Sequence, residues 1–175
     1  QADRCKKIVA GLLHFARQNK VVRSPQDVRE LMDRALRTIK IPENIAVKNE
    51  QDLADPVAEL DRDQVVQVLT NLISNAVAAM ETGGTLTLRC EGDADRVRLS
   101  VADTGIGVPV ENRKKIFEPF FTTKPMGKGT GLGLAVTYGI VKMHCGDIRL
   151  ESNADPDAGP TGTTFTVTLP RRASE

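Results

Sequence analysis

Apolar residues recur every three or four positions in four stretches of the chain, which is the spacing of a helix with one buried face. The stretches are 2–18, 27–39, 61–80 and 132–143. The strongest helix prediction is 61–80, because its apolar residues form one broad face and Asp61 stands where a carboxylate can cap the first turn. A further short helix is predicted over 111–116.

Shorter stretches alternate between apolar and polar residues, as strands with one buried face do. Segments 85–90 and 97–102 alternate clearly and flank the turn residues 92–94, so they predict a hairpin. Further strands are predicted over 147–151 and 163–169, and weaker extended segments over 21–24, 45–48 and 57–60. We expect loops over 52–56 and 153–162, and a tail at residues 170–172.

The 61–80 helix also carries a second stripe, which consists only of neutral amides. Gln64, Gln67, Asn71 and Asn75 follow one another at intervals of three, four and four residues, so they lie along one side of the helix. A solvated helix face would normally carry Lys and Glu, and asparagine is a poor helix former in helix interiors. The stripe therefore indicates either a polar contact to a neighbouring element or a surface that binds a ligand.

Glycines stand at 127, 129, 131 and 133, directly before the apolar pattern of the 132–143 helix. The start of a helix offers unpaired N–H groups and a positive dipole end, so phosphate is a natural ligand there. The spacing matches neither a P-loop nor a dinucleotide fingerprint. A flexible surface loop is the alternative explanation of the glycines.

An acidic residue ends the second strand of the predicted hairpin, in the sequence DTGIG at 103–107. Asp103 beside Gly105 and Gly107 supplies an acceptor that a flat ligand can approach closely. A tight turn would also explain this short motif.

Composition places the chain among globular proteins with one core, at 175 residues, 40% hydrophobic and 27% charged. A net charge of +1 argues against nucleic acid or an anionic membrane as the main partner. Cys5, Cys90 and Cys145 form no zinc spacing or disulfide framework, which fits a reducing, cytoplasmic compartment, and no apolar run is long enough to cross a bilayer. Because the chain begins at Gln1, we expect a fragment, and a membrane anchor elsewhere in its parent stays open.

Five motifs occur in a specific order. They are TNLISNA with Asn71 and Asn75, DTGIG at 103–107, FEPFF at 117–121, GTGLG at 129–133 and GTTF at 162–165. This order resembles that of the GHKL ATP-binding superfamily, and more narrowly the catalytic domain of a bacterial sensor histidine kinase. The resemblance covers about residues 22 to 170, and the chain before it resembles the end of the dimerisation hairpin that precedes such a domain.

The resemblance implies an α/β fold of the Bergerat type, a two-layer sandwich of a mixed β-sheet with three helices on one face. ATP would lie between the 61–80 helix and a lid that contains the glycines. The implied domains are residues 1–21, the second helix of the hairpin, and residues 22–175, the catalytic ATP-binding domain.

The family motifs also imply roles for individual residues. The oxygen of Asn75 would bind Mg²⁺, Asp103 would accept the adenine amino group, Gly105 and Gly107 would let the purine pass, and Thr163 or Thr164 would close the adenine pocket. In and before the lid, phosphate or nucleotide contacts would come from Phe117, Lys124, Lys128, Gly129, Thr130, Gly131, Leu132 and Gly133. The implied catalytic residues are Asn71, which also contacts the nucleotide, and Lys124.

Asn71 separates this chain from related ATPases of the gyrase, mismatch-repair and chaperone types, which have a glutamate there to activate water. An amide cannot serve as a general base, so slow hydrolysis is expected. Ala78 replaces a lysine that is frequent in sensor kinases, so its phosphate contact is expected to pass to Lys124 or Lys128. His14 and His144 match structural positions, and the phosphoacceptor histidine is expected on the hairpin helix that this chain lacks.

The implied activity is Mg-ATP-dependent phosphorylation of a histidine on the hairpin, followed by relay to an aspartate of a response regulator. The implied partners are therefore a response regulator receiver domain and a second copy of the full-length protein, joined through the hairpin. A regulatory module of the same fold is the alternative, such as an anti-sigma-type switch kinase or a nucleotide-gated interaction domain.

Overall fold

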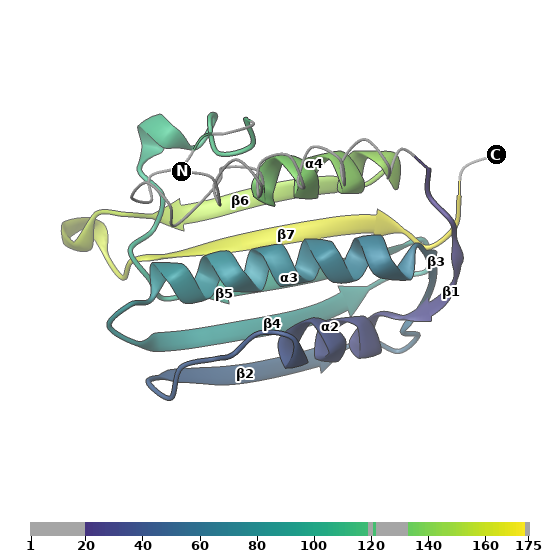
Figure 1. Cartoon of the computed structure of the whole chain (residues 1–175), viewed down its shortest axis with the longest axis horizontal. Helices are drawn as coiled ribbons and strands as arrows, with labels where there is room; N and C mark the ends of the chain where they lie inside the picture. The colour runs from purple at the N-terminus through teal and green to yellow at the C-terminus, as the bar shows by residue number, and fades with distance from the viewer. Residues whose placement is uncertain (1–19, 119–120, 122–132, 174–175) are drawn as a thin grey trace, which may run out of the picture.

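The computed structural model describes residues 20–118, 121 and 133–173 (Figure 1). The predicted helix over 2–18 and most of the predicted lid lie outside the described residues. The same holds for six of the expected site residues, Lys124, Lys128, Gly129, Thr130, Gly131 and Leu132. Those assignments therefore stay predictions.

The described residues form three α-helices, seven strands and two short 3₁₀ turns. The first half of the chain contains β1 (Ser24–Asp27), α2 (Val28–Arg37), β2 (Ile45–Asp52), β3 (Val57–Leu60), α3 (Arg62–Ala79) and β4 (Gly84–Gly92). The second half contains β5 (Arg96–Asp103), η1 (Val110–Asn112), α4 (Gly133–Met143), β6 (Asp147–Asn153), η2 (Pro156–Ala158) and β7 (Gly162–Pro170).

Five strands form one sheet in the order β2-β4-β5-β7-β6. β2 runs parallel to β4, whereas the other neighbours are antiparallel, so the sheet is mixed, as predicted. Figure 1 shows α2, α3 and α4 lying across one face of this sheet. The predicted two-layer α/β sandwich is confirmed.

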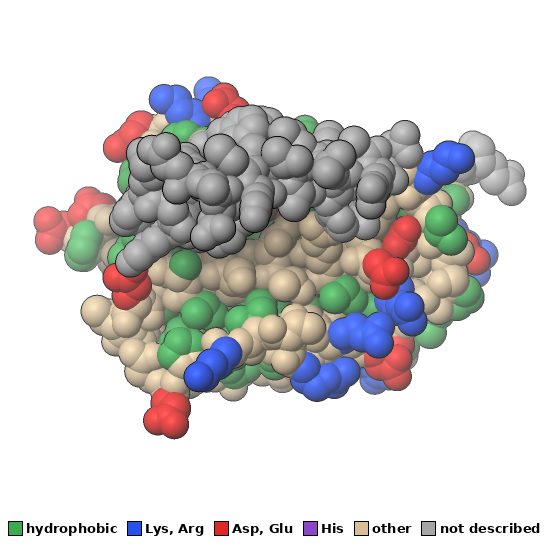
Figure 2. Space-filling model, in the orientation of Figure 1, with side chains coloured by type: hydrophobic (Ala, Val, Ile, Leu, Met, Phe, Trp, Pro, Cys, Tyr) green, Lys and Arg blue, Asp and Glu red, His purple; other side chains and the backbone are tan. Residues whose placement is uncertain are grey.

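The core lies between the helices and the sheet, because alternate strand residues point towards the helices. The buried apolar residues of β4, β5 and β7 are Leu86, Leu88, Cys90, Val97, Leu99, Val101, Phe165, Val167 and Leu169, and those of α3 are Val65, Val68, Leu69, Leu72, Ile73 and Ala76. Each fully buried aliphatic side chain of this kind stabilises the fold by roughly 1.5–3 kcal/mol. Charged side chains instead lie around the edge of the face seen in Figure 2.

The helix starts follow from their caps. The side chain of Asp27 accepts from the Arg29 N–H at 2.9 Å, and that of Asp61 accepts from the Gln64 N–H at 3.2 Å. Both satisfy donors that a helix start leaves unpaired. The N-terminal ends of α2 and α3 therefore lie where the sequence predicts them.

Two predicted elements are wrong in position or type, and a third, the strand predicted over 45–48, is confirmed but is longer than predicted. The first strand is Ser24–Asp27 rather than 21–24, and it pairs antiparallel with β3 in a separate two-stranded sheet. β2 continues to Asp52, and the predicted 111–116 helix is only the turn Val110–Asn112 followed by irregular chain. β1 and β2 have little buried side-chain surface, so backbone pairing rather than an apolar pattern defines them.

The predicted tail is also wrong, because Arg171 is buried. Its guanidinium donates to the carbonyls of Asp93 at 2.7 Å and Val57 at 2.8 Å, and it approaches the Asp55 carboxylate at 3.7 Å. The Arg171 backbone also pairs with Glu59 and Asp95. The end of β7 is thereby fixed to β3 and to the hairpin turn.

Candidate functional site

The amide stripe of α3 faces the start of α4 at Asn71. Its Nδ2 donates to the Gly133 carbonyl at 3.2 Å and to Thr137 Oγ1 at 3.4 Å, while the Thr137 hydroxyl donates to the same Gly133 carbonyl at 2.8 Å. A polar contact to a neighbouring helix, one of the two interpretations of the stripe, is therefore present at Asn71. This contact fixes the first turn of α4, directly after the glycine-rich segment, against the middle of α3.

One turn further along α3, Asn75 is half-buried and its amide makes no hydrogen bond within the described residues. A further turn on, the Ala79 carbonyl accepts from the Ile106 N–H at 3.1 Å. Residues four apart lie on one side of a helix, about 6 Å apart along its axis. Asn75 therefore lies between the start of α4 and the DTGIG loop, and no described residue engages its side-chain oxygen.

The stripe does not act as one surface along its whole length. Gln64, at its beginning, is 2% exposed and its Nε2 donates to the Lys20 carbonyl at 2.9 Å. That contact faces the chain before β1 and is remote in sequence from the loop at 103–107. The interpretation of the stripe as a ligand surface is thus confined to its second half, which contains Asn71 and Asn75.

Asp103 ends β5 with a carboxylate that is partly shielded from water. Burial raises the pKa of this carboxyl above its ordinary value, and hydrogen bonds from the backbone of Gly105 and Thr163 act in the opposite direction. One oxygen, Oδ1, accepts from the Gly105 N–H at 2.9 Å. The second oxygen leaves an acceptor for an N–H donor such as an exocyclic amino group.

The strand register separates the two threonines that the resemblance left as alternatives. Thr163 stands opposite Asp103 in the β5–β7 ladder and is 5% exposed, on the face that the helices cover. Thr164 pairs with Ala102, and successive strand residues point to opposite faces. Thr163 is therefore the threonine beside Asp103, and Thr164 lies on the open face of the sheet.

A polar network not predicted from the sequence supports this edge. The Ser152 hydroxyl accepts from the Val108 N–H at 2.7 Å and lies 2.8 Å from Thr163 Oγ1. The Arg113 guanidinium donates to the carbonyls of Ser152 and Val108. No motif marks Ser152 or Arg113 in the sequence, because both act through contacts that the tertiary register creates.

The glycines of the DTGIG loop are required by the packing of the backbone itself. A Cβ at Gly105 would lie 2.3 Å from the Ala79 carbonyl oxygen, and one at Gly107 would lie 2.1 Å from the Asn153 carbonyl oxygen. Gly107 also has a φ of +77°, which side chains rarely adopt. Close packing against α3 and β6 is therefore sufficient to explain both glycines. The access to a purine that the resemblance implies is compatible with this packing but is not needed to explain them.

Phe117 packs within the protein. Its ring centroid lies 5.6 Å from that of Tyr138 on α4 and 6.3 Å from that of Phe165 on β7, the latter edge-on. The edge-on contact with Phe165 is a favourable aromatic geometry, whereas the ring of Tyr138 is tilted by 40° to that of Phe117. Phe117 therefore attaches the chain that enters the glycine-rich segment to the side of the site.

The side chains of the candidate site suit a metal ion that is held mainly by the phosphates of a bound nucleotide. The described residues contain no cluster of three His, Cys, Asp or Glu side chains that could hold a metal ion. Mg²⁺ is commonly bound by one or two protein oxygens together with phosphates and waters, and the Asn75 amide oxygen suits that role.

In the described part of the chain no helix is long and apolar enough to cross a membrane.

A mixed sheet with three helices on one face, and an amide row between a glycine-rich helix start and a strand-end carboxylate, defines a nucleotide-binding α/β sandwich. The chain belongs to the family of histidine kinase-, DNA gyrase B-, and HSP90-like ATPases, whose sequence model matches residues 60–173. Within that family it is a catalytic domain of the sensor histidine kinase type.

Similar proteins support this placement. Sensor kinase CckA of Brucella abortus (strain 2308) is 36% identical over 191 aligned residues, which cover 99% of this chain and 20% of the relative. The structure of the mycobacterial sensor histidine kinase MprB has a TM-score of 0.74 and 31% identity, covering 87% of this chain and 100% of that chain. The chain spans between a fifth and two fifths of the length of five curated relatives that it matches.

Two similar structures contain a ligand or a partner. Full-length ShkA in complex with AMPPNP has a TM-score of 0.81 at 28% identity, covering 97% of this chain and 36% of that chain. Histidine kinase ThkA in complex with the response regulator protein TrrA has a TM-score of 0.77 at 28% identity, covering 98% of this chain and 48% of that chain. They illustrate a nucleotide analogue and a regulator bound to proteins of the same fold.

Proposed function

We propose that this domain binds ATP with Mg²⁺ and transfers the γ-phosphoryl group to a histidine of a dimerisation hairpin, from which it passes to a response regulator aspartate. The observation that carries the proposal is the row Asn71, Asn75 and Ala79 on α3. This row runs from the first turn of α4 to the DTGIG loop. A nucleotide along this row would place its phosphates at the start of α4 and its base at Asp103.

The adenine end of the proposed site is formed by Asp103 and Thr163. The half-buried carboxylate of Asp103 would accept the adenine amino group through the oxygen that the Gly105 N–H leaves unused. The Ser152 hydroxyl, which contacts Thr163, would hold this edge in place. Thr164, on the other face of the sheet, is not expected to contact the base.

The phosphate end depends on Asn75, on the start of α4 and on the lid. The Asn75 oxygen would hold Mg²⁺, which neutralises charge that develops during phosphoryl transfer. Gly133, and outside the described residues Gly129, Thr130, Gly131 and Leu132, would contact the phosphates, with Lys124 and Lys128 as counter-charges. Asn71, whose Nδ2 is engaged by α4, would act through its remaining oxygen and by positioning the first turn of α4.

In the proposed reaction the γ-phosphoryl group is transferred to a protein histidine rather than to water. The bond between the γ-phosphorus and the bridging oxygen breaks, a bond from phosphorus to an imidazole nitrogen forms, and ADP leaves. Asn71 cannot remove a proton from water, because an amide is not a general base at neutral pH. Hydrolysis is therefore expected to be slow compared with transfer.

Residues 1–21 would be the second hairpin helix and residues 22–175 the catalytic domain, in a homodimer that functions in the cytoplasm. A response regulator receiver domain is the proposed partner, and the similar ThkA structure, a complex with the response regulator protein TrrA, supports it. The alternative is a regulatory module of the same fold, such as a switch kinase, which needs no hairpin.

The test combines this chain with a purified hairpin from the parent that carries its acceptor histidine, in the presence of Mg²⁺ and ATP labelled at the γ position. We expect label on the hairpin in an acid-labile, base-stable form, and its loss with Asn75→Ala. Acid-stable label would support the switch-kinase alternative. Calorimetry that detects no binding of ATP to the unsubstituted chain would contradict nucleotide binding itself.

A further inference from the structure

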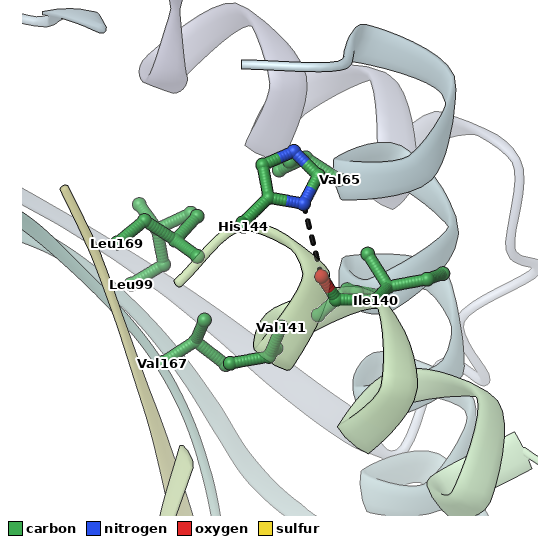
Figure 3. A pocket seen from close by; sticks show the side chains of 8 residues that line it. Val65, Leu99, Ile140, Val141, His144, Val167 and Leu169 are labelled. Carbon is green, nitrogen blue, oxygen red and sulfur yellow. Dashed lines mark hydrogen bonds between the residues drawn. The ribbon is translucent and has the colours of Figure 1, made fainter. Parts of the chain in front are cut away.

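His144 is a polar side chain enclosed in an apolar part of the core. The residue is 0% exposed, and Figure 3 shows its ring at the end of α4, among side chains of α3, α4 and the sheet. The apolar residues that surround it are Val65, Val68, Leu99, Ile140, Val141, Val167 and Leu169. A buried imidazole needs a hydrogen-bond partner for each ring nitrogen. The partners of His144 therefore show which elements its side chain connects.

The two ring nitrogens join two helices. Nδ1 lies 2.9 Å from the Ile140 carbonyl oxygen, which can only accept, so Nδ1 carries the proton. Nε2 is then the acceptor, and it takes the N–H of Asp61 at 3.2 Å. The neutral imidazole therefore connects the C-terminal end of α4 to the residue that caps α3.

Asp61 in turn holds the chain that leads into the domain. Its Oδ1 accepts from the Gln64 N–H, and its Oδ2 accepts from the Val22 N–H at 3.0 Å. Gln64 adds a second attachment through the bond from its Nε2 to the Lys20 carbonyl. The Gln64 Oε1 is buried and has no partner within the described part of the chain. Residues 20–22 are thus fixed to the first turn of α3.

The opposite end of α4 belongs to the proposed nucleotide site. Gly133 and Thr137 are bound there by Asn71, one turn from Asn75. α4 has 11 residues and is therefore about 16 Å long, and its buried side chains Val136, Ile140 and Val141 pack in the core. A close-packed helix of this length moves as a unit, so a shift at Gly133 reaches His144.

We propose that His144 is a positioning residue that couples the nucleotide site to the chain entering the domain, by way of Asp61 and Val22. The inference rests on the proposed function, since it assigns the nucleotide as the ligand that shifts α4. Coupling of this kind is reciprocal. Nucleotide binding changes how firmly residues 20–22 are held, and the state of residues 20–22 changes nucleotide affinity to the same extent.

The direct measurement is hydrogen exchange of the Val22 amide, followed by NMR in the full 175-residue chain with and without saturating Mg²⁺ and AMPPNP. In the unsubstituted chain we expect the two exchange rates to differ at least about fivefold, the lower end of typical coupling between sites. His144→Leu removes the acceptor but keeps an apolar side chain, so the ratio should fall below about twofold while calorimetry still detects AMPPNP binding. His144→Gln retains a neutral acceptor and should restore part of the difference.

A second pair of variants tests the reciprocal direction without changing the core. The Val22 side chain is 74% exposed. Val22→Pro removes the N–H that binds Asp61, whereas Val22→Ala keeps it. Because the coupling is reciprocal, we expect the AMPPNP dissociation constant to change at least about fivefold with proline and to stay within about 1.5-fold of the unsubstituted chain with alanine.

The outcomes separate the two proposals. An unsubstituted chain that binds AMPPNP without any change at Val22, or a His144→Leu variant that responds in the same way, overturns the coupling and leaves the proposed function intact. Equal dissociation constants for Val22→Pro and Val22→Ala overturn it as well, and this arm remains decisive if His144→Leu does not fold. Failure of the unsubstituted chain to bind AMPPNP overturns the proposed function first.

Discussion

Asp103 and Thr163 stand directly opposite each other at the ends of β5 and β7, both on the face of the sheet that the helices cover. The Ser152 hydroxyl lies beside Thr163 and donates to the Gly162 carbonyl at 2.9 Å or to Thr163 itself. A Cβ at Gly162 would lie 2.2 Å from the Asp103 carbonyl oxygen. The GTTF motif therefore combines close backbone approach with a hydroxyl beside the carboxylate.

This arrangement predicts different effects for two adjacent threonines. Thr163→Val keeps the shape but removes the hydroxyl beside Asp103, and we expect ATP affinity to fall by about 5- to 20-fold, the equivalent of roughly one to two hydrogen bonds. Thr164→Val makes the same chemical change on the opposite face and serves as the control, with affinity unchanged. Calorimetric titration with ATP measures both, and equal effects would contradict the placement of adenine.

The proposed role of Asn75 makes ATP affinity depend on Mg²⁺ through this side chain. Asn75→Ala removes the amide oxygen proposed for Mg²⁺, so the gain in ATP affinity on adding Mg²⁺ should fall by at least about tenfold, or 1.4 kcal/mol. Ser74→Ala is a suitable control, because Ser74 is exposed on the same turn of α3. If Asn75→Ala kept the full response to Mg²⁺, another residue would have to hold the ion.

How much of the fold the sequence predicts depends on which interaction forms each element. α3 and the β4–β5 hairpin are predictable, because their own residues carry a cap, a buried face and turn residues. β2 is underestimated, since only Ile45 of its eight residues is buried and the ladder to β4 forms it. β1 contains Pro25 and exists only through pairing with β3, which is distant in sequence.

The candidate site shows the same division. Asp103 and Asn75 stand out in the sequence by residue type and spacing. Ser152 and Arg113 do not, because their contacts depend on the register of β6 and β7 rather than on a local pattern. The choice between Thr163 and Thr164 likewise needs the register, since a shift of one residue exchanges the faces of a strand.

The close packing at Gly105 predicts that a single added methyl group there destabilises the fold. In Gly105→Ala the new Cβ would lie 2.3 Å from the Ala79 carbonyl oxygen, a backbone atom that cannot move away cheaply. We expect a loss of about 1–3 kcal/mol, typical of overpacking. Gly133→Ala is the matched control, because the nearest atom is 3.9 Å away, and its stability should stay within about 1 kcal/mol of the unsubstituted chain. Urea unfolding of both variants gives the comparison, and equal stabilities would argue against the close contact at Ala79.

The buried contacts of Arg171 predict that this side chain stabilises the fold. Arg171→Ala leaves the carbonyls of Asp93 and Val57 without their donor, so we expect a loss of about 2–3 kcal/mol in the free energy of unfolding. Arg172→Ala removes the same charge from an exposed neighbour and should change stability by less than about 0.5 kcal/mol. Similar values for the two variants in urea unfolding would show that the contacts of Arg171 contribute little.

His144 predicts how stability depends on pH. Burial lowers the pKa of this imidazole below 6.5, with the Ile140 carbonyl, Arg23 and Asp61 as smaller influences. Below pH 6.5 the unfolded chain therefore binds a proton that the folded chain excludes, so stability falls as the pH drops towards the folded-state pKa and is constant above about 6.5. The fall is at most about 1.4 kcal/mol for each pH unit.

His144→Gln isolates this contribution, because glutamine retains an acceptor for the Asp61 N–H but does not titrate. Asp103 and the other carboxylates are present in both proteins, so they cancel in the difference between the two curves. We expect the unsubstituted chain to lose more stability than His144→Gln between about pH 7 and pH 5 in urea unfolding, and the two to run parallel above about pH 7. Parallel curves over the whole range would mean that the imidazole takes up its proton in the folded protein as readily as in the unfolded chain, in conflict with a neutral ring that accepts the Asp61 N–H.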